Sequence, residues 1–169
     1  MKQFKTLVIA VVLAVGSMGF ASAQSKVAHI DVQQLVQDMP EMKAAQAELQ
    51  KLQGTYKTDI DASVQALQSK MKTYQTEAGT QTQEENQKRA QEVEGMQQNI
   101  MQAQQQAQQE LSQKEMELLK PILEKANAAI LKVGKAQGFD YVLDASTGSG
   151  VILADGKDLL AEVKKELGF

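Results

Sequence analysis

The sequence contains no cysteine, no tryptophan and one histidine, and aromatic residues make up only 4% of its 169 residues. Without cysteine, the chain has no disulfide framework, no thiol nucleophile and no thiolate metal site. His29 is alone, so it cannot complete a metal or catalytic site with a second histidine or a cysteine, and we interpret it as a structural residue. A chain without disulfides must be stabilised by packing or by assembly.

The N-terminal segment has the parts of a secretory signal peptide. Lys2 and Lys5 precede an apolar run at residues 7–15, and residues 21–23 (Ala-Ser-Ala) offer small side chains for cleavage. The alternative is a membrane anchor, but the run is too short to span a bilayer comfortably. We therefore predict an exported protein that is cleaved after Ala23.

The charge balance argues against two classes of partner. Removing Lys2 and Lys5 with the leader leaves 16 basic and 21 acidic residues, a net charge of −5. This balance does not favour nucleic acid, and the chain has no polybasic patch for an anionic membrane. Contact with a membrane is therefore possible but is not supported by charge.

Candidate catalytic groups are few. Asp31, Asp140, Asp144 and Asp155 lie at or near the ends of expected strands, where two of them could act as an acid and a base. Hydrogen bonding to the backbone is the commoner role of such aspartates, and we prefer it. Residues 147–150 (Thr-Gly-Ser-Gly) lack the phosphate-loop pattern and are expected to form a hairpin turn between strands. We therefore predict no enzymatic activity, no cofactor and no metal.

Proline occurs only at positions 40 and 121, and the segment between them, 41–120, contains only three glycines. Apolar residues recur at steps of three and four through its first half, which is typical of a helix. The pattern stops at Gly79 and resumes after a capping box formed by Thr82 and Glu85. We therefore predict a hairpin of two helices, each on the order of 55 Å long.

The second half of this hairpin is rich in glutamine. Between Gln81 and Gln113, 13 of 33 residues are glutamine, and apolar residues are sparse. Glutamine favours helix, so the helix is retained, but the thin seam predicts a flexible hairpin, most of all between Gly79 and Gly95. Aggregation of the prion-like kind is the less favoured alternative, because charges and a helical period run through the segment.

The flanking residues 24–40 and 121–169 are expected to form one small head. Three short strands, at 26–32, 139–145 and 151–154, and two or three helices make a marginal unit with exposed sheet edges. A further helix is expected to begin at Pro121. Self-association through the head would cover these edges. The residues predicted for the core of the head and of its assembly are Val27, Ile30, Tyr141, Leu143, Val151 and Leu153.

Four segments, 27–31, 39–49, 140–146 and 150–159, together with the order of strand, hairpin and head, resemble the Skp/OmpH family of periplasmic chaperones. The resemblance covers residues 24–169. It implies a homotrimer whose heads form a barrel-like body and whose hairpins surround unfolded outer-membrane proteins without ATP. It supplies no catalytic residue. This sequence differs in charge, because residues 77–94 hold five acidic residues against two basic ones, whereas well-known members are basic.

We therefore predict a mostly helical α+β protein, with the hairpin arm 41–120 inserted into a head that trimerises. We predict an ATP-independent periplasmic holdase for unfolded outer-membrane β-barrel proteins, which prevents their aggregation during transit. The alternative is a structural coiled-coil spacer or adaptor of the cell envelope, which would require one specific partner and a firm seam. The residues predicted for arm packing and client contact are Met42, Leu49, Tyr56, Ile60, Met71, Tyr74, Met96 and Ile100.

Overall fold

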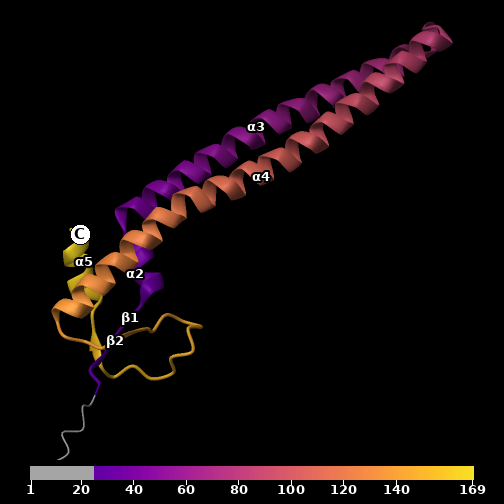
Figure 1. The fold of residues 1–169 in the computed structure, drawn as a ribbon. Coiled ribbons are helices and arrows are strands. Elements are labelled where there is room, and N and C mark those ends of the chain that lie inside the picture. The colour runs from indigo at the N-terminus through magenta and orange to yellow at the C-terminus, as the bar shows by residue number, and fades with distance from the viewer. Residues whose placement is uncertain (1–24) are drawn as a thin grey trace, which may run out of the picture.

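The computed structural model describes residues 25–169, so the predicted leader and its cleavage site lie outside the described residues. A small head carries a long arm of two helices (Figure 1). The predicted mostly helical α+β fold with a helical hairpin is thus confirmed. The elements in chain order are β1 (Val27–Ile30), α2 (Val32–Asp38), α3 (Pro40–Glu77), the short 3-10 helix η1 (Ala78–Thr80), α4 (Gln83–Ala136), β2 (Tyr141–Asp144), β3 (Lys157–Asp158) and α5 (Leu160–Leu167).

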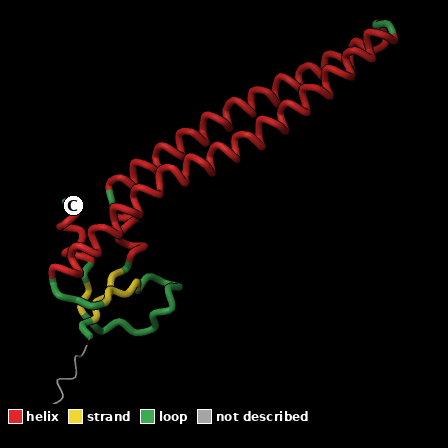
Figure 2. Tube along the Cα trace, viewed as in Figure 1, coloured by secondary structure: helices red, strands yellow, loops and turns green. Residues whose placement is uncertain are grey.

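The ends of the arm helices follow from local chemistry. Pro40 occupies the first turn of α3, where its missing N–H costs no hydrogen bond, and Glu41 favours the positive end of the helix dipole. At the far end, η1 makes the turn around Gly79. The hydroxyl of Thr82 then accepts the backbone N–H of Glu85 at 3.2 Å and starts α4. The predicted turn and N-cap are confirmed, and the two helices run side by side (Figure 2).

No new helix begins at Pro121, which lies inside α4. That prediction is wrong because tertiary contacts of the turns that follow the proline hold the helix together. An internal proline costs about 3 kcal/mol, but Ile122 and Ala126 in the next turns are buried in the head. Lys125 also forms an ion pair with Glu41 of α3. Helix α4 therefore runs as one element from the arm tip into the head (Figure 1).

The sheet is parallel and has the order β2-β1-β3. The strand predicted at 151–154 is wrong, because these residues lie in a loop and Lys157 and Asp158 form the third strand instead. Residues 147–150 are also not a turn between paired strands, since β1 separates β2 from β3. Two parallel strands must be joined by a crossover connection, and residues 145–156 form the connection from β2 to β3.

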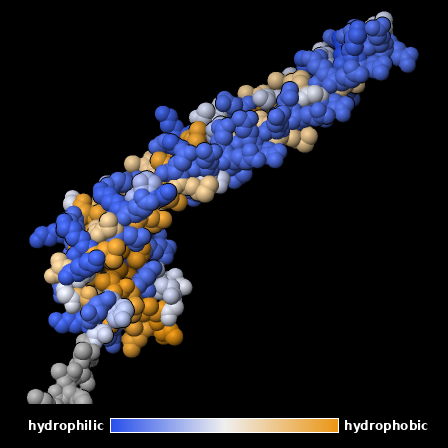
Figure 3. Space-filling view, in the orientation of Figure 1, coloured by the Kyte–Doolittle hydropathy of each residue, from blue (hydrophilic) through white to orange (hydrophobic). Residues whose placement is uncertain are grey.

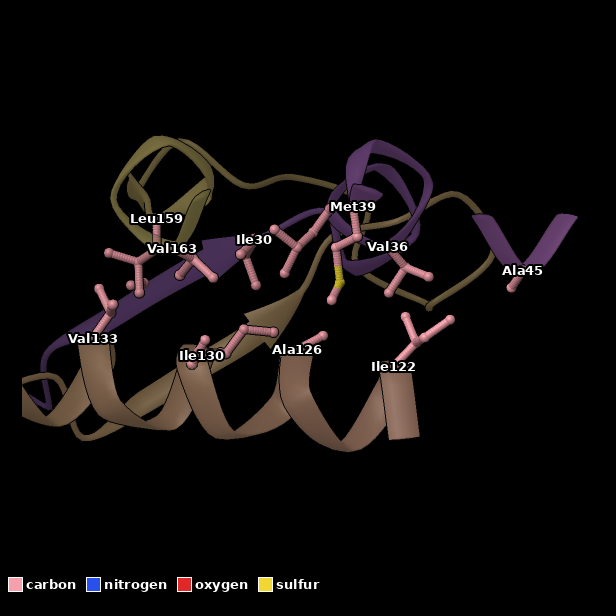
Figure 4. Close-up of a cluster of buried hydrophobic side chains, with 13 residues drawn as sticks. Ile30, Val36, Met39, Ala45, Ile122, Ala126, Ile130, Val133, Leu159 and Val163 are labelled. Carbon is pink, nitrogen blue, oxygen red and sulfur yellow. The ribbon is translucent and has the colours of Figure 1, made fainter. Parts of the chain in front are cut away.

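The core of the head lies between the sheet, α2, α5 and the last turns of α4 (Figure 4). Helix α4 approaches β2 closely, because a Cβ at Gly134 would lie 2.8 Å from Cγ2 of Val142. The buried residues of this core are Ala28, Ile30, Leu35, Val36, Met39, Ala45, Ile122, Ala126, Ala129, Ile130, Val133, Leu159 and Val163.

Candidate functional site

Three of the four candidate aspartates accept hydrogen bonds from the backbone, whereas Asp155 is exposed. Asp31 caps α2 by accepting the backbone N–H of Gln34 at 2.8 Å, and Asp140 accepts that of Lys26 at 2.8 Å. Asp144 accepts two backbone N–H groups, at 2.9 and 3.3 Å. Burial opposes ionisation of Asp144, but these hydrogen bonds outweigh it and hold its pKa below the ordinary value. All three side chains are therefore occupied by structural contacts.

His29 lies in the central strand, where its backbone carbonyl accepts the N–H of Leu159 at 3.0 Å. Within residues 25–169, no group of three His, Asp or Glu side chains has an arrangement that could hold a metal ion. In the same residues, none of the helices combines the length and hydropathy that crossing a membrane requires. The surfaces of the head and the arm are therefore the candidate sites.

The outer face of the head sheet is apolar and uncovered in the single chain. Of the six predicted core residues, Ile30 is buried, Val151 is half-buried, and Tyr141 and Leu153 are 60% and 75% exposed. Side chains alternate between the faces of a strand, so Ala28 and Ile30 point into the core while their neighbours point away from it. The exposed residues are outside the core of the single head, and their role in an assembly stays a prediction. The remaining two, Val27 and Leu143, are also exposed.

Strand β2 also presents an unpaired edge, because it is one of the two edge strands of the sheet. Beside it, an open cavity of about 620 Å³ lies against α4, with Leu131, Phe139 and Tyr141 among its lining residues. Apolar surface gathers on the head and on the projecting loop that contains Ile152 (Figure 3). Exposed apolar surface beside an open sheet edge is typical of a surface that another chain covers.

The arm seam is only partly the predicted one. Ile100 is buried between α3 and α4, whereas Met71 is 44% exposed and does not pack there. Lys70 takes the seam position, because its ammonium forms an ion pair with Glu92 of α4. Met71 is therefore not a packing residue of the single chain, and its contact with a client stays a prediction. The other predicted arm residues are half-buried: Met42, Leu49, Tyr56, Ile60, Tyr74 and Met96.

Ion pairs and hydrogen bonds also join α3 to α4, at positions between the apolar contacts of the seam. Lys114 of α4 lies 2.8 Å from Glu48 of α3, and the Tyr56 hydroxyl donates to Glu110. This hydrogen bond raises the pKa of Tyr56 and lowers the pKa of Glu110. The seam is therefore a mixture of thin apolar packing and cross-arm hydrogen bonds.

The tip of the arm is held by a group that we call the tip clasp: Lys70, Tyr74, Glu77, Arg89 and Glu92. The Arg89 guanidinium lies 4.6 Å from the centroid of the Tyr74 ring and 2.9 Å from Glu77. Lys70 and the Tyr74 hydroxyl both donate to Glu92. The hydrogen bonds from Lys70 and then Tyr74 lower the pKa of Glu92, and the same bond raises the pKa of Tyr74.

The tip clasp is not predicted by the sequence patterns described above. From the sequence, Arg89 was counted only as one of the two basic residues of segment 77–94, although its side chain is just 15% exposed. The signal was the apolar period itself, which stops before Gly79 and is absent from the start of α4. Charged residues that continue a helical stripe into an apolar gap indicate a polar seam.

Along the middle of the arm, a shallow slot opens between the helices. One cavity of about 350 Å³ is lined by Ile60, Met96 and Ile100, among others. A second, of about 280 Å³, continues it and shares Ser63 and Ala103 with the first. We call the two together the arm slot. Three residues predicted for client contact thus line the first of these cavities.

These features define a class of protein, in which a small α+β head with an open sheet edge carries a long helical hairpin with a slot between its helices. The sequence model of the OmpH-like outer membrane protein family matches residues 26–167. The chain therefore belongs to the OmpH-like family.

Two relatives illustrate this membership. The chain is 26% identical over 162 residues to the chaperone protein Skp of Yersinia enterocolitica, an alignment that covers 92% of this chain and 97% of Skp. Its fold is similar to the crystal structure of an OmpH-like outer membrane chaperone from Caulobacter crescentus, with a TM-score of 0.77, 21% identity, and coverage of 86% and 85% of the two chains.

Proposed function

We propose that this protein is an ATP-independent holdase of the periplasm, which binds unfolded outer-membrane β-barrel proteins and prevents their aggregation during transit. Membership of the OmpH-like family supports a chaperone role, as does the similarity to a protein named as a chaperone. The observation that carries the proposal is the arm. It places the arm slot, whose lining mixes aliphatic and polar side chains, and scattered half-buried side chains on a long polar scaffold, away from the head.

Such an arm suits a client that must be held and then released. Each apolar contact is small, but many contacts made by several arms act together by raising the effective concentration of the next contact. Methionines such as Met71 and Met101 are exposed on the arm, and methionine adapts to many shapes. Binding and release therefore need no nucleotide, because no single contact is strong.

In this proposal the heads assemble as a homotrimer. The exposed outer face of the sheet, the unpaired edge of β2 and the projecting loop around Ile152 are the surfaces that the assembly covers. Several arms then project from one body and enclose the client between them. The leader directs export, and its cleavage after Ala23 releases the mature chain into the compartment through which barrel proteins pass.

One observation favours the alternative, a coiled-coil spacer or adaptor of the envelope. The tip clasp gives the end of the arm a defined polar structure, as a rigid spacer would need. A spacer would bind one folded partner and would leave an unfolded barrel protein unprotected.

The test is to dilute a denatured outer-membrane barrel protein into buffer with the mature chain and follow light scattering without ATP. The holdase predicts suppression of scattering at near-stoichiometric amounts of assembled chaperone. It also predicts that suppression persists at moderate salt, because the contacts are apolar rather than ionic. Absence of suppression at any ratio contradicts the holdase and favours the spacer.

A further inference from the structure

The arm slot continues into a third surface that the function above does not use. A groove of about 460 Å³ runs along α4 and is lined by Gln102, Gln105, Gln106, Gln109, Glu110 and Gln113. It shares Gln106 and Glu110 with the second cavity of the arm slot, the one of about 280 Å³. The residues that line this groove, which we call the glutamine row, therefore adjoin the arm slot at Gln106 and Glu110, on one side of the arm.

The row offers neutral amide groups. No charged residue occurs between Glu94 and Glu110, although charged residues make up 23% of the chain. Glu110 is engaged by Tyr56 and by Gln106, whose amide donates to it at 2.8 Å. The side chains at positions 102, 105 and 109 are exposed, and no side-chain hydrogen bond engages them within residues 25–169.

A glutamine amide carries the same donor and acceptor as a peptide group. Gln102, Gln106, Gln109 and Gln113 follow one another at steps of four, three and four, so they rise by about 4.5–6 Å each. Peptide groups that face one side of an extended chain recur about every 6.6–6.8 Å. The long glutamine side chain can absorb this difference.

The length of the surface also fits an extended segment. From Met96 to Gln113 the helix rises by about 25 Å, which an extended chain spans in seven or eight residues, most of one strand of a membrane barrel. Such strands alternate apolar and polar residues. Their apolar side chains match the slot, and their backbone groups match the row beside it.

We propose that the glutamine row and the arm slot together bind one extended segment of an unfolded polypeptide, with its backbone on the amides and its alternate apolar side chains in the slot. This inference rests on the proposed holdase function and names the face of the arm that performs it. Recognition of backbone is independent of client sequence, and recognition by neutral amides is independent of salt.

The first test uses two peptides of about ten residues, the length of a barrel strand, that alternate valine and threonine. They differ only in N-methylation of alternate residues, which removes backbone donors on one edge. Binding to the full mature chain is followed through the side-chain amide resonances of its glutamines. We expect N-methylation to weaken binding roughly tenfold, the effect of losing one or two net hydrogen bonds. Equal affinity for the two peptides, or resonances of Gln102, Gln105 and Gln109 that do not shift, overturns the proposal.

The second test uses the triple variant Gln102→Ala, Gln105→Ala, Gln109→Ala, which keeps good helix formers at exposed positions. We expect it to bind the unmethylated peptide about tenfold more weakly and to lose most of the discrimination between the peptides. A matched control replaces three exposed glutamines of α3, Gln50, Gln53 and Gln68, and should bind as the parent chain does. Equal losses in both variants overturn the proposal.

Light scattering with a denatured barrel protein separates this inference from the proposed function. If the parent chain and the triple variant protect equally, the holdase function stands and the glutamine row is not its binding face. If the parent chain does not protect, the proposed function itself fails, whatever the peptides show. Protection by the parent that falls in the triple variant but not in the α3 control supports both.

Discussion

The head and the arm are stabilised by different forces. In the head, Ile30, Leu35, Met39, Leu159 and Val163 are fully buried, and burial of apolar surface dominates. In the arm, apolar contacts between α3 and α4 are few, and ion pairs and hydrogen bonds between the two helices contribute to the same seam. The head should therefore respond mainly to changes in packing volume, and the arm mainly to charge, pH and salt.

The largest expected effect is a cavity in the head. Leu35→Ala removes a fully buried side chain and should lower the free energy of unfolding by about 2–5 kcal/mol. Urea unfolding at fixed protein concentration measures this, because assembly makes stability depend on concentration. Met116→Ala, at an exposed methionine of α4, is the control and should change it little. Similar losses for both would contradict the buried core.

A pair of glycine substitutions sharpens the comparison. Gly134→Ala places a Cβ 2.8 Å from Val142, and this overpacking, which costs about 1–3 kcal/mol, should outweigh the gain in helix propensity. Gly54→Ala in α3 meets nothing within 4 Å and should instead stabilise the chain by about 0.5–1 kcal/mol. Urea unfolding should show opposite signs, and two shifts of the same sign would contradict the close approach of α4 to β2.

Arg89→Gln tests the tip clasp. It removes the contacts with Tyr74 and Glu77, and we expect faster amide hydrogen exchange in the last turns of α3 and the first turns of α4. Exchange in the head should not change. Lys88→Gln is the control, because within residues 25–169 Lys88 pairs only with the exposed Glu84 of its own helix. Equal exchange in the two variants would show that the clasp does not hold the tip.

Low pH should loosen the arm before the head. The pKa values of Glu41, Glu92 and Glu110 are lowered from 4.5 by their hydrogen bonds to Lys125, Lys70 and Tyr56. Their contribution to stability is therefore complete above pH 4.5 and is lost as the pH falls through the lowered values. Hydrogen exchange at acid pH should rise along the arm first. In Glu92→Gln the tip should already exchange quickly at neutral pH and depend less on pH.

The sequence predicted the arm better than the head. Helical periodicity, Pro40 and the Thr82 cap are local signals, and they placed α3, the turn and the start of α4. The helix start predicted at Pro121 was wrong, because local sequence rules do not include the tertiary packing of Ile122 and Ala126 that keeps α4 continuous at the proline.

The sheet was harder to predict because its pairing is nonlocal. Residues 151–154 have the composition of a strand, yet the strand that pairs with β1 is the polar Lys157–Asp158. Only the fold shows that β1 needs a parallel neighbour there. In the arm, the helical pattern identified six half-buried seam positions and the buried Ile100. It placed Met71 at a seam position where Lys70 lies instead, because the spacing of apolar residues does not reveal an ion pair across the seam.

The central claim is that the head assembles and the arm protects, and removing most of the arm tests it most directly. Tyr56 and Glu110 face one another across the seam, so residues 57–109 can be replaced by a short Gly-Ser turn without separating the helices near the head. Light scattering of a denatured barrel protein is then compared between the full and the shortened chain, with sedimentation as the check on assembly. We predict a shortened chain that still assembles but no longer suppresses aggregation. A shortened chain that assembles and protects as well as the full chain would contradict the account.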